Sequence, residues 1–151
     1  MKQASLSTPF GDLTLTEEDG AITALGWGQA ARQDRSDLLV AALRQLKEYA
    51  TGERQSFDLP LRVMGSDFQR AVCTAILAIP FGHTRTYGEI ARDLGVPAQA
   101  VGGACGGNPI PVIIPCHRVM GAKGLTGFSG AGGVETKVAL LRHEGAAGLL
   151  I

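Results

Sequence analysis

Two short helix signals joined by a tight turn constrain the fold of this chain more than any other feature. Thr86 and Glu89 fit a capping box, in which a hydroxyl residue begins a helix and an acidic residue follows three positions later. This helix should run through Leu94 and end at Gly95, and Pro97 suits the first turn of a second helix. Such a pair forms a helix-turn-helix. On the pattern alone, ordinary helical packing is the commoner explanation and DNA reading the rarer one.

The second of these helices is unusual because it carries no charge and almost no large side chain. Its sequence from Gln99 to Gly107 includes four glycines, each of which costs a helix about 1 kcal/mol relative to alanine. Glycines at that cost indicate that another backbone approaches closely. The narrow groove of DNA and a tightly packed helix both fit this pattern.

The N-terminal part of the chain has the pattern of a small sheet with one helix. Leu13 to Thr16 alternates between apolar and polar residues, Asp19-Gly20 marks a turn, and Ile22 to Trp27 resumes the strand. Asp37 to Ala50 places its apolar residues on one helical face, and Gly52 ends that helix. Residues 1–62 are therefore predicted as one α/β domain, and no catalytic chemistry stands out in it.

Residues 63–151 are predicted as a second domain that begins near the Met64-Gly65 joint. Ser66 and Gln69 fit another capping box, so a helix is expected from there to Ile79, before a proline.

Three further segments complete this domain in the prediction. Val112 to Ile114 is expected as a buried strand, and Gly121 to Gly133 as a loop rich in glycine and small residues. The last helix is expected from Val134 to His143, with three residues facing inward: Val138, Leu140 and Leu141.

The charge balance narrows the function classes. The 151 residues include 14 Lys and Arg and 14 Asp and Glu, which excludes an overall polycation held on nucleic acid by bulk charge. Met1 to Leu61 holds six basic and nine acidic residues, net −3, whereas Arg62 to Ile151 holds eight basic and five acidic, net +3. The two halves therefore suit different tasks, although an offset of this size is also common in small domains.

Several features point to a cytoplasmic protein. No uncharged stretch is apolar enough to span a bilayer, and the N-terminus lacks the apolar region of a signal peptide. Three cysteines, an odd number without metal-ligand spacing, are typical of a reduced protein. We expect no metal, no cofactor and no membrane partner.

Cys116 is the strongest candidate for chemistry. A lone cysteine is usually an inert small hydrophobe, and reactivity needs a nearby cation, imidazole or helix N-terminus to lower its pKa. His117, Arg118 and Glu144 could supply such an environment. Because consecutive residues of a strand face opposite sides, His117 can reach Cys116 only if the backbone turns or a water bridges them.

The segment from Asn108 to Val119 resembles the active-site signature of the O6-alkylguanine-DNA alkyltransferases, the methylated-DNA–protein-cysteine methyltransferase family. Four further segments match in the right order, so that the likeness spans about Ser66 to Gly145: Thr86 to Ala91, Ala100 to Gly102, Gly127 to Gly130 and His143 to Gly145. The N-terminal part resembles the family's ribonuclease-H-like α/β domain only in layout. The resemblance implies a mixed α/β (α+β) fold, in which a mainly helical, winged helix-turn-helix-like domain follows that small domain.

The resemblance implies direct-reversal DNA repair by a protein that acts once. Cys116 would accept the alkyl group of O6-alkylguanine, with O4-alkylthymine a further possible substrate, and form a stable thioether. Glu144 would orient His117, and His117 would draw the proton from Cys116 through a water. Asn108 would brace this network, and Tyr87 would donate a hydrogen bond to the guanine ring.

The resemblance also implies how the substrate is held. The backbones of Cys116, Val119 and Ser129 would contact the base, with Phe128 as an apolar wall and Arg118 nearby. The partner would be double-stranded DNA containing alkylated guanine, bound by a monomer, with the base flipped out. The second helix would enter the minor groove and read shape, and the residues implied in DNA contact are Thr86, Gln99, Ala100, Gly102 and Gly103.

Two positions depart from the family pattern. Gln99 stands where the family usually has an arginine that fills the gap left by the flipped base. We therefore expect weaker stabilisation of the extruded base, or a different intercalating residue. Phe128 stands where a tyrosine is common, which removes one hydroxyl from the pocket.

Three other readings remain open at this point. The chain could be a non-catalytic sensor of alkylated DNA, although the alkyltransferase-like proteins of that type replace the acceptor cysteine. It could be a regulator that reads an operator, although base readout favours charged or amide side chains and the second helix is uncharged. It could be a cysteine hydrolase, although no oxyanion-hole motif is evident.

Overall fold

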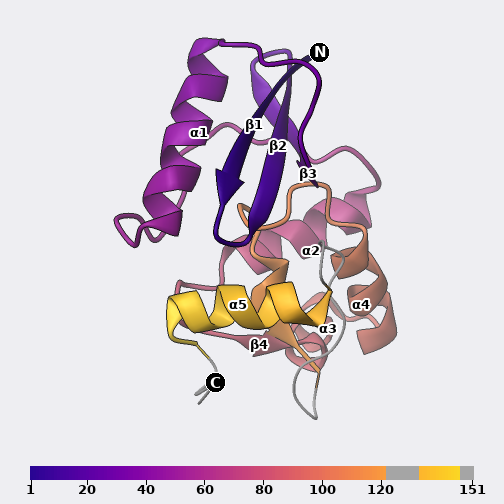
Figure 1. Cartoon of the computed structure of the whole chain (residues 1–151). Helices are drawn as coiled ribbons and strands as arrows, with labels where there is room; N and C mark the ends of the chain where they lie inside the picture. Colours follow the sequence, from indigo (N-terminus) through magenta and orange to yellow (C-terminus); the bar gives the residue numbers. More distant parts are fainter. Residues whose placement is uncertain (122–132, 147–151) are drawn as a thin grey trace. The chain divides into compact units, whose positions relative to one another are not determined.

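A computed structural model describes residues 1–121 and 133–146, which belong to two compact units divided between Met64 and Gly65. The N-terminal unit holds three strands and one helix, and the C-terminal unit holds the remaining helices and a short strand pair (Figure 1).

The N-terminal unit is an antiparallel sheet covered by a helix. Its strands are β1 (Lys2–Thr8), β2 (Gly11–Glu18) and β3 (Ala21–Trp27), in the order β1-β2-β3. The predicted hairpin is confirmed as β2 and β3, and its turn places Asp19 and Gly20 at positive φ. Helix α1 (Asp37–Ala50) is also confirmed, and it lies along one face of the sheet (Figure 1). Its buried side chains, among them Leu39 and Leu46, belong to the core of this unit together with the buried side chains of the three strands.

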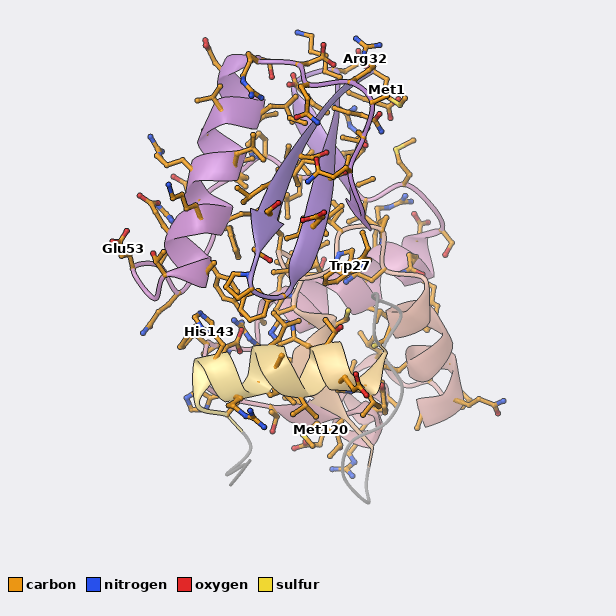
Figure 2. All side chains as sticks on the ribbon, in the orientation of Figure 1. Met1, Trp27, Arg32, Glu53, Met120 and His143 are labelled. Carbon is orange, nitrogen blue, oxygen red and sulfur yellow. The ribbon has the colours of Figure 1, made fainter. Side chains whose placement is uncertain are left out.

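Figure 2 labels two side chains of this unit whose contacts hold its ends. Trp27 closes β3 and lies close to Gly11 at the start of β2. Arg32 pairs with Asp34, whose carboxylate also accepts from the Gln3 amide.

The C-terminal unit has four helices in the described residues. They are α2 (Asp67–Leu77), α3 (Tyr87–Leu94), α4 (Ala98–Gly106) and α5 (Val134–Glu144). A short 3₁₀ helix, Cys116–Arg118, precedes strand β5 (Val119–Met120), which pairs in parallel with β4 (Arg85–Thr86). No helix among the described residues has the length and apolarity needed to cross a membrane.

The helix-turn-helix is confirmed as α3 and α4, which pack against each other (Figure 1). Both halves of the capping box at Thr86 are present: its hydroxyl accepts from the Glu89 amide at 3.1 Å, and the Glu89 carboxylate accepts from the Thr86 amide at 2.8 Å. Gly95 ends α3 in the left-handed conformation, with φ +68°. Pro97 is the N-cap of α4, one residue before the position expected.

Only one half of the capping box at Ser66 is formed. The Ser66 hydroxyl accepts from the Gln69 amide, but the Gln69 side chain donates to the Ala104 carbonyl at 2.8 Å instead of reaching back. This bond ties α2 to α4. Helix α2 ends at Leu77, two residues before the predicted limit.

Two details of the prediction for this unit are wrong. No strand forms at Val112 to Ile114: Val112 and Ile113 make a turn, Ile114 makes only an isolated bridge with Pro111, and Val112 has a φ of +72°. On α5, Val138 is only half-buried, while Lys137 is fully buried beside Leu140 and Leu141. Both errors concern the surroundings of Cys116.

Candidate active site

The turn that carries Cys116 is held together by one side chain, Asn108. Its amide nitrogen donates to the Ile114 carbonyl at 2.8 Å, and its oxygen accepts from the Ile110 amide at 3.0 Å. The Ile114 amide closes the turn by donating to the Ile110 carbonyl at 2.9 Å. An apolar segment can therefore be buried without a strand partner, because its backbone groups are satisfied locally.

Cys116 opens the 3₁₀ helix that follows this turn. Its side chain is buried, as are those of the two residues after it. His117 can act on Cys116 only if the backbone turns or a water bridges them, and the backbone does turn at this point. The Cys116 amide donates to the Ile114 carbonyl at 2.7 Å. This bond fixes the start of the 3₁₀ helix directly after the turn that Asn108 holds.

The Cys116 thiol is not electrostatically primed in the resting state. Burial raises the pKa of the thiol, and a hydrogen bond from Asn108 and the charge of Lys137 oppose that effect without overcoming it. A buried thiol of raised pKa stays protonated at neutral pH. Its use as a nucleophile therefore needs a base that takes the proton when the reaction begins.

His117, the next residue in the chain, is the candidate for that base. Its ring is completely buried, and Nε2 lies 2.7 Å from a Glu144 carboxylate oxygen. Nδ1 is the one buried side-chain nitrogen or oxygen of the described residues with no hydrogen-bond partner. Burial lowers the pKa of His117, and the hydrogen bond from its ring to Glu144 opposes that shift.

The neighbouring ion pair fixes the tautomer of His117. Arg118 donates to both oxygens of Glu144, through Nε at 2.8 Å and an Nη at 3.0 Å. Because arginine stays protonated, this pairing keeps Glu144 ionised and acceptor-only. His117 Nε2 must then donate, which leaves the lone pair on Nδ1 free to accept a proton.

Arg118 is engaged inside the protein. Its other Nη donates to the Ile79 carbonyl at 2.7 Å, and its guanidinium lies 5.8 Å from the centre of the Phe81 ring. His143, labelled in Figure 2, precedes Glu144 at the C-terminal end of α5, and its ring meets the Phe81 ring edge-on. The Arg118 side chain therefore contacts Glu144 inside the protein and not an exposed surface that could bind the substrate.

Lys137 belongs to this neighbourhood and was missed in the sequence analysis. Its side chain is fully buried, its Nζ donates to the Val119 carbonyl at 2.6 Å, and it lies 5.9 Å from the centre of the Tyr87 ring. The sequence signal that could have revealed its burial is its helical spacing. Lys137 precedes Leu140, Leu141 and Glu144 by three, four and seven positions, which places all four on one face of α5.

A groove of about 800 Å³ lies on the helix-turn-helix. Its lining combines the start of α3 with the exposed face of α4: Thr86, Tyr87, Gly88, Arg92, Ala98, Gln99, Gly102 and Gly103. Four of the five residues implied in DNA contact line it, while Ala100 is half-buried beside it on α4.

The glycines of α4 and the glycine at its C-cap face two different environments. A Cβ on Gly102 or Gly103 would meet no described atom within 4 Å, whereas one on Gly107 would lie 3.1 Å from the Gln69 side-chain oxygen. Tight packing within the described protein thus accounts for Gly107 but not for Gly102 and Gly103. These two leave a thin, open helix face.

Two predicted substrate contacts, Phe128 and Ser129, lie outside the described residues. Val119 is buried in β5, with its carbonyl on Lys137. Within residues 1–121 and 133–146, no group of three or more His, Cys, Asp and Glu side chains is placed to hold a metal ion.

Comparison with known proteins decides the family. The model of the 6-O-methylguanine DNA methyltransferase DNA-binding domain matches residues 67–146, and that of the ribonuclease-like domain of the same enzymes matches residues 1–63. The chain belongs to this family. Its activity is direct-reversal DNA repair, in which a methyl group moves from DNA to a protein cysteine.

Relatives and solved structures agree over nearly the whole chain. The methylated-DNA–protein-cysteine methyltransferase of Mycolicibacterium paratuberculosis is 42% identical, over 93% of this chain and 90% of its own. The methylated-DNA–protein-cysteine methyltransferase of Methanosarcina acetivorans is 38% identical, over 96% of this chain and 99% of its own. The crystal structure of Mycobacterium tuberculosis OGT in complex with DNA superimposes with a TM-score of 0.85 at 41% identity, covering 96% of this chain and 93% of that one.

Proposed function

We propose that Cys116 accepts the alkyl group from O6 of an alkylated guanine in double-stranded DNA, once per protein molecule. The observation that carries this proposal is the buried His117, with Nε2 on Glu144 and Nδ1 unpartnered, next to a buried thiol. This arrangement supplies a nucleophile and a base whose orientation is already fixed.

The reaction follows from these positions. His117 Nδ1 takes the proton of Cys116 through a bridging water, and the imidazolium that forms is stabilised by Glu144. The sulfur attacks the alkyl carbon in line with the bond to O6, so that a C–S bond forms as the C–O bond breaks. The electron pair goes to guanine, and a hydrogen bond from Tyr87 reduces the charge on the leaving base until it is protonated.

Asn108 and Arg118 act through other residues. Asn108 holds the turn that presents Cys116, and its hydrogen bond favours the thiolate. Arg118 keeps Glu144 ionised and thereby sets the direction of the His117–Glu144 hydrogen bond. We therefore assign Arg118 to the support of the base and not to substrate contact.

The acceptor is expected to be consumed. A thioether carbon is a poor electrophile, and none of the described groups beside Cys116 could displace it, because they are a base, a carboxylate ion pair and a buried lysine. One alkyl group per chain is the stoichiometry that follows.

DNA binding is assigned to the face formed by α3 and α4. The open space above Gly102 and Gly103 gives α4 the small cross-section that a minor groove about 6 Å wide requires. The alkylated oxygen lies within the duplex, so the base must be flipped out at a cost of a few kcal/mol. Gln99 is exposed in this groove and can hydrogen-bond, but not with the reach or charge of arginine.

The protein is proposed to act as a cytoplasmic monomer. Cys116, His117 and Glu144 all come from one chain, so a second copy is not needed to complete the site. All three cysteines are unpaired thiols, as is typical of a reducing compartment. A non-catalytic sensor is not favoured, since the acceptor cysteine and its base are both present.

The test is the intact mass of the protein after mixing with a duplex that contains one O6-methylguanine. We expect a gain of one methylene unit that stops at one equivalent and maps to Cys116. The Cys116→Ser variant should gain nothing. Tight binding to the lesion without any gain in mass would overturn the proposal and place the chain among the sensors.

A further inference from the structure

Of the described residues that line the groove on the helix-turn-helix, Arg92 alone carries a charge. It lies on α3, and its side chain is exposed. Gly88 lines the groove with it, since residues four positions apart share one face of a helix. Helix α4, which forms the other wall, contributes only uncharged residues. The charge of this groove therefore comes from α3.

The two acidic residues of α3 are both engaged by groups other than Arg92. Asp93 pairs with Arg85 at 2.7 Å, and the Glu89 carboxylate accepts from the Thr86 amide in the capping box. That hydrogen bond is the main cause of the lowered pKa of Glu89, to which the charge of Arg92 contributes least. Within the part of the chain that the structure describes, no ion pair or side-chain hydrogen bond holds Arg92. Its guanidinium is therefore available to a partner outside the chain.

The place of Arg92 beside α4 suits a phosphate rather than a base. Arg92 lies near the end of α3 and Gln99 near the start of α4, on either side of the turn that joins the two helices. When α4 occupies the minor groove through its open face, the helix packed beside it crosses the sugar–phosphate backbone at the edge of that groove. The planar fork of a guanidinium matches the oxygens of a phosphate.

We propose that Arg92 binds a phosphate of the DNA backbone and supplies the cation that α4 lacks at this interface. This role rests on the proposed function, in which α3 and α4 form the DNA-binding face. The contact carries no sequence information, because every step of the backbone presents the same phosphate group. It positions the duplex on the open face of α4 and adds to affinity by releasing a counterion.

The experiment measures the affinity of the full chain for lesion-free duplex DNA against salt concentration. Arg92→Gln removes the charge, and Arg92→Lys keeps it. Arg142→Gln is the matched control, because it removes an exposed cation of α5 that does not line the groove. Two duplexes of unrelated sequence are titrated by fluorescence anisotropy with each protein.

The substitutions at Arg92 should leave the fold intact. The side chain is exposed, and arginine, lysine and glutamine have similar helix propensities. Arg92 also lies in the last turn of α3, where a cation favours the helix dipole by a small amount. Thermal unfolding of each variant therefore separates an effect on α3 from an effect on DNA.

We expect Arg92→Gln to reduce the slope of log affinity against log salt by about 0.9, the value for one phosphate contact on a duplex. The loss of affinity should be about fifteenfold at 50 mM salt and about fourfold at 200 mM, because the same slope applies across that range. Both duplexes should lose affinity equally. Arg92→Lys should keep the slope, and Arg142→Gln should match the unmodified protein.

An unchanged salt slope in Arg92→Gln would overturn the proposal. An equal fall in Arg142→Gln would also overturn it, since net charge and not the groove would then matter, and so would a loss confined to one duplex sequence, which indicates a base contact. Methyl transfer to the unmodified protein is measured in parallel. If no methyl group is taken up while the slope still falls in Arg92→Gln, the repair chemistry fails and the phosphate contact stands.

Discussion

At the scale of single residues, Glu144 is shared between the neutral imidazole of His117 and the guanidinium of Arg118. One oxygen accepts from both His117 and Arg118, and the other also accepts from Arg118. Arg118 therefore both satisfies the buried carboxylate and competes with His117 for it. The charge of Arg118 also lowers the pKa of His117, whereas Glu144 raises it. The base strength of His117 depends on this balance.

Replacing Arg118 by methionine should shift that balance in a measurable direction. Glu144 would be left as a buried anion with His117 as its only partner among these groups, so the pKa of His117 should rise. A charged His117 cannot take a proton from Cys116, and methyl transfer at neutral pH should slow. Breaking a buried pair in this way costs about 3–5 kcal/mol, which denaturant unfolding would report.

The titration of the His117 ring by NMR is the decisive measurement for this variant. Arg142→Met, which removes an exposed cation from the last turn of α5, is the control and should leave the His117 titration unchanged. A His117 pKa that stays low in Arg118→Met would contradict the role given to the arginine.

At the scale of elements, local signals were enough where a segment's own residues fix its structure. The start of α3 is set by Thr86 and Glu89 within one turn, and its end by Gly95, so both were predictable. The turn at Val112 was not, because it depends on the Asn108 side chain, which bonds backbone groups up to six residues away. Gln69 likewise fits a capping box in sequence, but the carbonyl of Ala104 is within its reach only in the folded unit.

The burial of Lys137 shows the same limit at the proposed site. Its spacing from Leu140 and Leu141 fits the inner face of α5, but lysine is rarely buried, so the position was not predicted, and the bond to the Val119 carbonyl is seen only in the folded unit. The resemblance supplied Cys116, His117, Glu144, Asn108 and Tyr87 because the family shares their motifs. It supplied no expectation for Lys137.

Gly102 within α4 and Gly107 at its C-cap should respond in opposite ways to substitution. Gly102→Leu adds a side chain in open space and improves helix propensity, so the free energy of unfolding should rise by about 0.5–1 kcal/mol. The same side chain would obstruct a groove of DNA, and affinity for a duplex should fall by about tenfold, which corresponds to about 1.4 kcal/mol.

Gly107→Ala is the reciprocal control. Its Cβ would crowd the Gln69 oxygen at 3.1 Å and strain the bond between α2 and α4, so stability should fall while duplex affinity changes little. Thermal unfolding and a fluorescence binding titration measure both quantities. Equal losses of affinity in the two variants would remove α4's open face from the DNA interface.

At the scale of the whole molecule, the buried base links activity to stability. His117 is held neutral in the folded chain by burial, which lowers its pKa below the ordinary value of 6.5, whereas the unfolded chain protonates it near 6.5. Below that pH the unfolded state therefore binds more protons than the folded state. Stability is fully present above about pH 6.5 and falls as the pH decreases towards the folded-state pKa, by up to about 1.4 kcal/mol per pH unit.

This loss should be visible between pH 6.5 and about 5, before ordinary carboxylates begin to titrate. Urea unfolding followed by circular dichroism across that range measures it, and His117→Gln should show a flatter dependence because the titrating group is gone. The same protonation removes the base that Cys116 requires. Methyl transfer should thus decline as the pH falls towards the folded-state pKa of His117, which lies below the range where stability starts to drop. An enzyme whose stability did not change over this range would show that His117 is not held neutral by burial.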